Sequence, residues 1–302
     1  METMPEGGKQ AVYEFHEEEA RAQEKRRAQA VSETASGFET CYHLIAGLPT
    51  LTAAIARVRT GQLPIEPDPN LSHAANYLYM ITGRRPTRVE EKIMDICLIL
   101  HADHGMNAST FAAIVVASTL SDLYASVGSG VAALNGPLHG GANERVLATL
   151  EDIGSPENVK PWLAKMLQRK ERIMGFGHRV YKTYDPRARI LGPLARRMQD
   201  GNPDCARLFE TALTLEEEVI HSLGREKGIY PNVDFYSGLV YSALGIPRDL
   251  FTPTFAVARV AGWAARVMEY LQNNRLFRPR AIYTGPLDRR YVRPGRRGRR
   301  RG

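Results

Sequence analysis

Residues 107–134 read NASTFAAIVVASTLSDLYASVGSGVAAL, a stretch rich in Ala, Ser, Val and Gly. Small side chains at this density suit a helix that packs closely against another helix, within one chain or between two chains. The stretch therefore predicts tightly packed helices and favours an all-α fold.

Apolar residues three and four positions apart predict further helices on both sides of this stretch. In residues 39–62 the residues with this spacing are Leu44, Leu48, Leu51, Ile55 and Val58. The other helical patterns cover residues 72–83, 87–103, 143–152, 156–172, 186–200, 203–224, 235–245 and 252–273. An alternating strand pattern is missing apart from a short candidate at residues 281–284, so the sequence predicts a nearly all-α protein.

The composition changes after Gly136-Pro137, where the helices become more charged. The small, apolar type returns near residue 236. This pattern predicts a discontinuous large domain with a smaller inserted one. The expected parts are a charged N-terminal segment at 1–40, a large domain at 41–142 and 236–286, a small domain at 143–235, and an Arg-rich, disordered tail at 287–302.

The basic character of the chain belongs to its C-terminal tail. The chain has 302 residues, with 40 Lys and Arg against 33 Asp and Glu, giving a net charge of +7. Residues 287–302 contain eight Arg and one Asp, which account for the whole of that charge. A Gly/Arg/Pro tail is more often a solvated end than an RNA- or anion-binding arm, so nucleic-acid binding is not favoured.

Cysteine content and the N-terminus indicate a soluble protein of a reducing compartment. The three cysteines, Cys41, Cys97 and Cys205, are far apart and form no CxxC pair, which argues against disulfides and a cysteine zinc site. Continuous apolar runs such as residues 111–117 are too short to span a bilayer. The acidic N-terminus resembles neither a signal peptide nor a transit peptide. We therefore expect a cytoplasmic protein without a membrane partner.

Four short segments crowd His, Asp, Gly and Pro into otherwise helical sequence. They are LHADHGMN (100–107), NGPLHGGAN (135–143), MGFGHRVYKTYDPR (174–187) and YPNVDFYSG (230–238). Helix ends and Gly turns let polar side chains and free backbone N–H groups face a cleft.

Each segment also has a purely structural interpretation. His101 and His104 could share a metal, but no further ligand is spaced nearby, and a His at a helix end is often a capping or core residue. Pro-Leu-His-Gly-Gly could be a plain turn, a single GxG is weak evidence for anion binding, and Asp234 could cap a helix. The set as a whole favours a site for a carboxylate substrate, because Arg187, Arg259 and Arg278 accompany it.

Taken together and in this order, the segments resemble the citrate synthase family, including 2-methylcitrate synthases. GPLHGGANE, MGFGHRVYKTxDPR and PNVDFYSG carry most of the resemblance, which runs from about residue 40 to about residue 292. It implies an all-α homodimer in which a small domain closes over the substrates. The implied reaction is a Claisen condensation of acetyl-CoA or propionyl-CoA with oxaloacetate. Thioester hydrolysis to citrate or 2-methylcitrate and CoA follows.

The resemblance also implies a role for individual residues. His139 would hydrogen-bond the thioester oxygen as the enol forms, Asp234 would take the methyl proton, and His178 would polarise the ketone of oxaloacetate. The other implied contacts are His104, Arg187, Arg259 and Arg278 for oxaloacetate, with Arg278 reaching the partner subunit's site, and Gly175, Gly177 and Lys182 for CoA. No metal or redox cofactor is implied. A carboxylate base opposite a hydrogen-bond donor suits removal of a weakly acidic proton.

The N-terminus departs from the family pattern. The family has a long segment before the position of Cys41, whereas residues 1–40 here are short, charged and unlike it. Such a difference would leave apolar surface uncovered. The alternative hypothesis is therefore a truncated, non-catalytic or partner-dependent subunit. A nucleic-acid-associated protein acting through residues 289–301 is a third, disfavoured hypothesis. One methylene discriminates weakly in a pocket, so the sequence does not choose between acetyl-CoA and propionyl-CoA.

Overall fold

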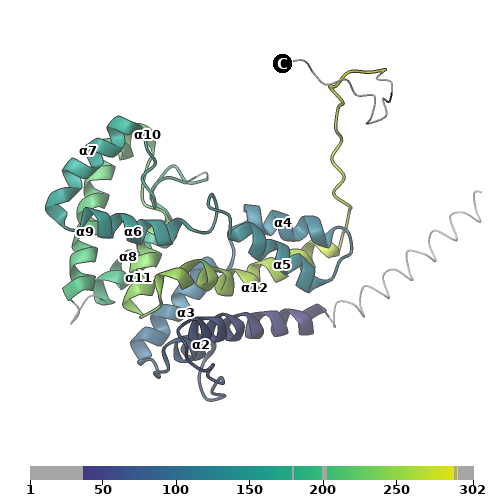
Figure 1. The fold of residues 1–302 in the computed structure, drawn as a ribbon, viewed down its shortest axis with the longest axis horizontal. Coiled ribbons are helices and arrows are strands. Elements are labelled where there is room, and N and C mark those ends of the chain that lie inside the picture. The colour runs from purple at the N-terminus through teal and green to yellow at the C-terminus, as the bar shows by residue number, and fades with distance from the viewer. Residues whose placement is uncertain (1–36, 179, 199–202, 289–290, 292–302) are drawn as a thin grey trace, which may run out of the picture.

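The computed structural model describes residues 37–178, 180–198, 203–288 and 291 (Figure 1). Within these residues the chain is helical, and the nearest thing to a strand is an isolated antiparallel bridge between Phe176 and Pro231. The all-α prediction is confirmed, and no strand forms at residues 281–284. Almost all of the charged N-terminal segment and of the Arg-rich tail lies outside the described residues.

The first described helix is Gly37–Arg59. The longer helices that follow are α2 (His73–Thr82), α3 (Arg88–Ala102), α4 (Ala108–Ala117), α5 (Leu123–Leu134), α6 (Ala142–Ile153), α7 (Val159–Arg169), α8 (Pro186–Met198), α9 (Pro203–Val219), α11 (Val233–Ala243) and α12 (Phe251–Leu271). Short turns of helix are η1 (Pro156–Asn158), η2 (Ile220–Gly224), α10 (Arg225–Lys227) and η3 (Arg248–Leu250).

The small-residue stretch 107–134 forms a pair of helices, α4 and α5. Asn107 caps α4, and Asp122 caps α5 by accepting a hydrogen bond from the amide of Ala125. Between them Leu120 adopts a left-handed backbone with φ of 63°. The left-handed backbone at Leu120 turns the chain, and the cap at Asp122 then starts a new helix. The stretch therefore forms two helices instead of one.

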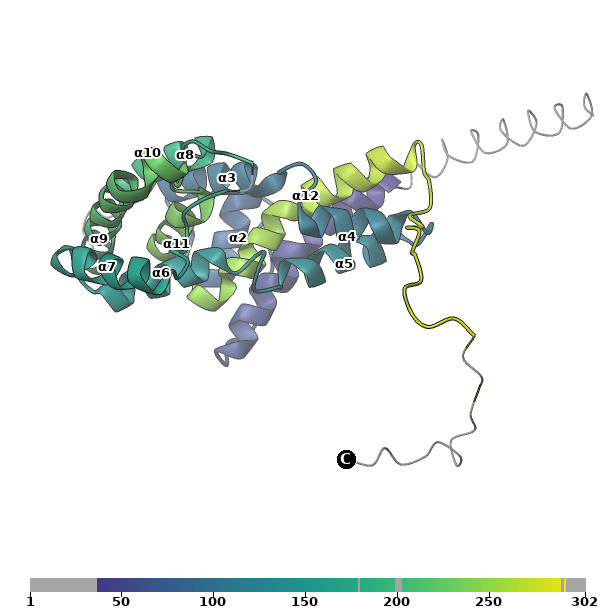
Figure 2. The same cartoon turned by 90° about the horizontal axis from the view of Figure 1, so that it is seen from above.

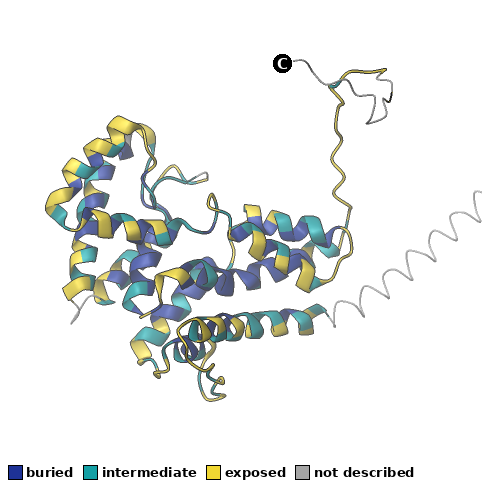
Figure 3. Cartoon of the chain, in the orientation of Figure 1, coloured by how far each residue is buried: buried dark blue, intermediate teal, exposed yellow. Residues whose placement is uncertain are grey.

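Helix α12 connects the two ends of the molecule (Figures 1 and 2). Its Val257 belongs to the main core, which also takes in α2, α3, α6 to α9 and α11. Its Trp263 lies in a second cluster with α5, and its Val267 lies in a third with α4. Figure 3 shows α12 as largely buried, while the outer faces of α7 and α9 are exposed.

Helix Gly37–Arg59 buries only part of its apolar surface. Its Ala53 enters the main core, and Leu44 and Leu48 pack partly against the clusters. The rest of the predicted apolar stripe faces outward, with Leu51, Ile55 and Val58 exposed at 62%, 56% and 60%. We call these three residues the exposed stripe. By length and composition, this is the one described helix that could cross a bilayer, although the sequence suggested that none was long enough.

Candidate active site

The carboxyl end of α3 approaches α12 closely. A Cβ atom on Gly262 would lie 2.0 Å from the carbonyl oxygen of Ala102, so only glycine permits this approach. Arg259, one turn earlier in α12, is 2% exposed, and its Nε donates to the carbonyl of His101 over 2.7 Å. Burial and the charge of Arg187 lower the pKa of Arg259 to about 10. Within the described residues Nη1 and Nη2 of Arg259 form no hydrogen bond, so their N–H groups are available to an anion.

The two histidines of the first segment have different environments. His101 is fully buried within the core, where its Nδ1 lies 2.8 Å from the carbonyl of Cys97, and its Nε2, like that of His104, has no hydrogen-bond partner among the described residues. His104 follows the end of α3, and its Nε2 is buried without a hydrogen-bond partner. Burial and the charges of Arg187, His178 and Arg259 lower the pKa of His104 to about 4. A neutral His104 is thus free to donate to a ligand.

His104 and His178 lie side by side although they come from different segments. Their ring centroids are 5.0 Å apart in an edge-to-face arrangement. Tyr181 stacks on His178 at 4.8 Å and contacts His104 edge-on at 5.7 Å. The structure therefore brings two of the predicted residues together and adds Tyr181, to which the sequence assigned no role.

Backbone contacts set the tautomer of His178. Its Nδ1 accepts hydrogen bonds from the amides of Val180 at 3.0 Å and Tyr181 at 3.1 Å. Burial and the charge of Arg187 lower the pKa of His178, which favours the neutral ring. A neutral ring that accepts at Nδ1 carries its proton on Nε2, where it can be donated.

Asp234 lies in the first turn of α11. The side chain of Asn232 caps this helix and accepts from the amide of Asp234 over 3.0 Å. Burial raises the pKa of Asp234 to about 6, and Asp185 adds to this while Arg187 and Arg259 oppose it. A carboxylate with a pKa near 6 is ionised at neutral pH and is a stronger base than an ordinary aspartate.

The turn before α6 holds His139 against the start of α4. The amide of Ser109 donates to His139 Nε2 over 3.2 Å, and the Ser109 hydroxyl lies 2.9 Å from the same nitrogen. That hydroxyl donates to Asn107 Oδ1 over 2.7 Å and accepts from Trp263 Nε1 over 3.1 Å. Burial lowers the pKa of His139. A neutral His139 therefore carries its proton on Nδ1.

Asn232 ties the third and fourth segments together. Its amide donates to the carbonyl of Gly175 over 2.8 Å, and its side chain donates to the carbonyl of Gly177 over 3.0 Å. The amide of Gly177 donates in turn to Tyr230 over 2.9 Å. Gly175 has φ of 80°, and a Cβ there would lie 2.7 Å from Val146. These glycines thus bring the loop that carries His178 next to Asp234.

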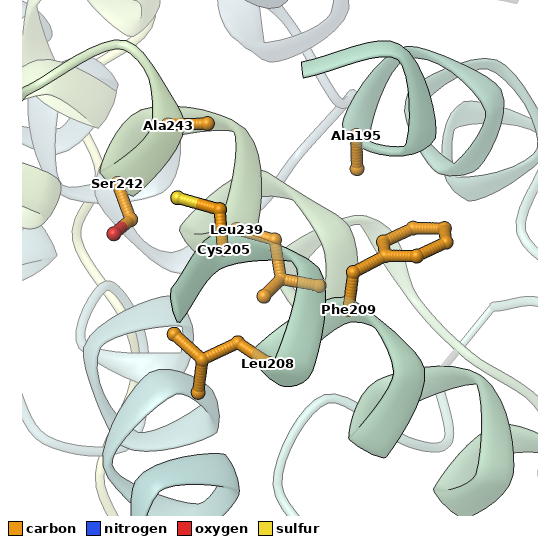
Figure 4. Close-up of a pocket in the computed structure, with 7 residues that line it drawn as sticks. All are labelled: Ala195, Cys205, Leu208, Phe209, Leu239, Ser242 and Ala243. Atoms are coloured by element: carbon orange, nitrogen blue, oxygen red, sulfur yellow. The ribbon is translucent and has the colours of Figure 1, made fainter. Parts of the chain in front are cut away.

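Two predicted residues lie apart from these contacts. Arg278 is exposed in the extended segment after α12, where, among the described residues, its guanidinium donates to the carbonyl of Pro279 over 3.5 Å. Lys182 is exposed on the loop that follows His178. A small pocket between α8, α9 and α11 is lined by none of the predicted residues (Figure 4). Its lining residues are Ala195, Cys205, Leu208, Phe209, Leu239, Ser242 and Ala243.

Comparison with known proteins identifies the family. The model of the citrate synthase C-terminal domain matches residues 7–280. The citrate synthase of Synechocystis sp. is 55% identical over 251 residues, which are 82% of this chain and 62% of that protein. The chain belongs to the citrate synthase family. The citrate synthase of Deinococcus radiodurans is 50% identical over 251 residues, which are 82% of this chain and 66% of that protein.

Solved citrate synthases share the fold. That of Pyrobaculum aerophilum superposes with a TM-score of 0.83 at 46% identity, covering 88% of this chain and 66% of that one. That of Thermoplasma acidophilum, solved with carboxymethyl coenzyme A and oxaloacetate, superposes with a TM-score of 0.82 at 40% identity, covering 89% and 73%. The chain thus spans a little under two thirds of the length of the curated relatives named above.

Several residues of this citrate synthase-like site were not assigned a role from the sequence. They are Asn107, Ser109, Tyr181, Asp185, Asn232 and Trp263. Most of them lie inside the four segments, so crowding of polar residues was the available signal. Within the described residues, no group of three or more His, Cys, Asp and Glu side chains is placed to hold a metal ion.

Proposed function

We propose that this chain catalyses the citrate synthase reaction, in which acetyl-CoA and oxaloacetate condense and water releases citrate and CoA. The observation that carries the proposal is that the chain combines a half-buried base of raised pKa with two neutral histidines of defined tautomer. Asp234 has a pKa of about 6, while hydrogen bonds leave His139 and His178 with protons on Nδ1 and Nε2. This combination suits enolisation followed by carbon–carbon bond formation.

Asp234 removes a proton from the methyl group of the thioester in the first step. The electron pair moves onto the thioester oxygen, where His139 Nδ1–H stabilises the enol or enolate. A neutral imidazole is a suitable donor here, because its pKa is closer to that of an enol than the pKa of an imidazolium is. Both groups are half-buried, which limits the access of water that would weaken these interactions.

Oxaloacetate is the electrophile in the second step. His178 Nε2–H donates to its ketone oxygen, and the enol carbon attacks the ketone carbon to give citryl-CoA. The buried Nε2 of His104 and the free N–H groups of Arg187 and Arg259 hold the carboxylates. Water then cleaves the thioester. The reaction needs no cofactor beyond its two substrates.

Assembly and CoA contacts form part of the same proposal. Arg278 acts from the partner subunit of a homodimer, and Gly175, Gly177 and Lys182 contact CoA. The small domain, residues 143–235, closes on the large domain, residues 41–142 and 236–286. The protein acts in the cytoplasm. A mixture of Arg278→Ala and Asp234→Asn chains tests the shared site. Activity above that of either variant alone supports it, and loss equal to that of the separate variants contradicts it.

Release of free CoA tests the proposed reaction. Purified chain is mixed with oxaloacetate and either acetyl-CoA or propionyl-CoA, and the thiol is followed over time. Asp234→Asn is the matched control, since it keeps size and shape but removes the base. Oxaloacetate-dependent release by the wild-type chain alone supports the proposal. Release that does not depend on oxaloacetate, or equal release by both chains, contradicts it.

A second candidate is a subunit that is active only with another polypeptide. The exposed stripe of Leu51, Ile55 and Val58 favours it, because large apolar side chains on one exposed helix face often mark a contact surface. The discriminating measurement adds a separately produced N-terminal fragment of a full-length relative. Activity that appears only with the fragment favours this candidate over the first.

A further inference from the structure

Asp185 is a buried carboxylate between two parts of the candidate site. It directly precedes α8, and it is 1% exposed. Its amide donates to the carbonyl of Pro231 over 3.3 Å, and its carbonyl accepts from the amide of Arg189 over 3.2 Å. Its backbone therefore joins the start of α8 to the loop before α11.

The carboxylate of Asp185 forms a two-pronged ion pair with the guanidinium of Arg187. Arg187 Nε donates to Oδ1 over 3.1 Å, and Nη2 donates to Oδ2 over 2.8 Å. The amide of Arg187 also donates to Oδ1, over 2.9 Å. A two-pronged contact fixes the plane of a guanidinium. It leaves both N–H groups of Nη1 directed away from Asp185.

The same carboxylate holds the start of α11. Its Oδ2 accepts from the amide of Val233 over 3.2 Å, and the next residue is Asp234. One side chain thus fixes both a carboxylate-binding arginine and the backbone that carries the base.

We propose that Asp185 is a positioning residue for the condensation. It aims the guanidinium of Arg187 at a carboxylate of oxaloacetate, and it anchors the turn from which Asp234 reaches the thioester methyl group. This inference rests on the proposed function for its substrates.

Burial of this ion pair argues for a role beyond stability. The side chains of Arg187 and Asp185 are 12% and 1% exposed, whereas in every other ion pair of the described residues one partner is at least 37% exposed. Desolvation offsets most of the attraction in a buried pair, so such pairs contribute little net stability. A function that needs a fixed guanidinium therefore explains the buried pair better than a contribution to stability does.

The charge of Asp185 also balances Arg187 within the site. Burial raises the pKa of Asp185, but the hydrogen bonds and charge of Arg187 outweigh this and keep its pKa below the ordinary value. Asp185 raises the pKa of Asp234, whereas Arg187 and Arg259 lower it. Without Asp185, burial alone would oppose the two arginines, and the pKa of the base would fall.

The test compares Asp185→Asn with the wild-type chain by three measurements. Calorimetry with oxaloacetate is expected to show a dissociation constant raised about 10-fold, because a charge-assisted pair that orients Arg187 is lost. Turnover is expected to fall about 100-fold, since small misplacements of reacting groups are costly. The carboxyl carbon of Asp234, followed by NMR without substrate, is expected to titrate at lower pH. Asp249→Asn is the control, because Asp249 pairs with Arg59 where both side chains are more than half exposed.

The NMR titration separates this inference from the proposed reaction. If the wild-type chain releases no CoA, the proposed function fails, yet the titration of Asp234 still reports on Asp185. An unchanged titration together with unchanged oxaloacetate affinity would overturn the positioning role. The positioning role would also be overturned if the loss of activity in Asp185→Asn matched the fraction of that variant that is unfolded.

The Asp185→Glu variant separates the effect of the charge from the effect of the side-chain geometry. It also replaces Asp185→Asn as the test if that variant does not fold. The longer side chain keeps the charge but displaces Arg187 and the start of α11. We expect a Michaelis constant for oxaloacetate raised about 5-fold or more, with the acid limb of the pH profile unchanged. A wild-type Michaelis constant in this variant contradicts the inference.

Discussion

The amide of Ser109 donates to Nε2 of His139 over 3.2 Å, so this nitrogen carries no proton in the neutral ring. The remaining proton lies on Nδ1. Ser109 is itself held by Trp263 and Asn107, which connects the orientation of the imidazole to the packing of α4 against α12.

Ser109→Ala is expected to lower turnover about 10-fold with a small effect on the Michaelis constant for oxaloacetate. The hydroxyl contact to His139 disappears, while the backbone donor remains. Trp263 also loses its acceptor, which should cost about 1–3 kcal/mol of unfolding free energy. Steady-state kinetics and urea unfolding check both effects. A Michaelis constant that rises while turnover stays constant would contradict this role.

Asp234→Asn is expected to lower turnover by a factor of about 10² or more, since a general base acts in the transition state. Oxaloacetate binding should change little. Calorimetry with oxaloacetate and CoA release together measure the difference. An equal loss of binding and turnover would count against Asp234 as the base.

The same substitution should stabilise the folded chain at high pH. The pKa of Asp234 is raised to about 6 in the fold, so the folded chain binds this proton more tightly than the unfolded chain. The resulting cost to stability is fully present above pH 6 and disappears as the pH falls toward the ordinary carboxyl pKa of about 4. We expect Asp234→Asn to gain about 3 kcal/mol at pH 8 and about half as much at pH 5. Urea unfolding of both chains at the two pH values measures this gain in unfolding free energy. An equal gain at pH 5 and pH 8 would refute the raised pKa.

Activity should rise with pH through the same range. The base must be ionised, so kcat/KM is expected to increase about 5-fold from pH 5 to pH 6, about 10-fold from pH 5 to pH 7, and to level off above pH 7. His104, with a pKa lowered to about 4, remains neutral over this range, and the lowered pKa of His178 favours its neutral form. An acid limb near pH 4 would show that Asp234 is not desolvated.

Arg259→Lys is expected to raise the Michaelis constant for oxaloacetate more than that for acetyl-CoA. Lysine keeps the charge but lacks the planar fork with which Arg259 donates Nε–H to the carbonyl of His101 and offers two further N–H groups to a carboxylate. Arg266→Lys is the control, since Arg266 lies on the same helix in an exposed pair with Asp103. Equal effects of the two substitutions would remove Arg259 from the carboxylate site.

Leu51→Gln is expected to leave the unfolding free energy within about 0.5 kcal/mol of the wild type, because its side chain is 62% exposed. Leu78→Gln, at a position 2% exposed in α2, should cost several kcal/mol. Thermal unfolding compares them, and light scattering should show less aggregation of Leu51→Gln. A large loss with Leu51→Gln would mean that the exposed stripe is already covered in solution.

Helical periodicity predicted the elements well where local signals were strong. The pattern at 87–103 became α3, Arg88–Ala102, with a capping box between Thr87 and Glu90. The reversal inside 107–134 was not predicted, because it depends on one left-handed residue, Leu120. The outward direction of Leu51, Ile55 and Val58 could not be predicted either, since spacing defines a face but not its surroundings.

The candidate site was predictable in its chemical groups but not in its supports. His104, His178 and Asp234 stood out because polar residues crowd into helical sequence. Asp185 and Val233 are 48 positions apart, and Asn232 and Gly177 are 55 apart, so their hydrogen bonds have no local signature. Tautomers likewise depend on backbone groups that come together only in the folded chain.

Helix α12 contributes to all three buried clusters, which has a consequence for the dynamics of the chain. A local opening of α12 would expose all three at once, so its amides should be among the slowest to exchange with deuterium. The two ends of the molecule should melt in one cooperative transition, as parts of a single unit. The proposed closure of the small domain must then take place around a stationary Arg259, with the loop that carries His178 moving toward it.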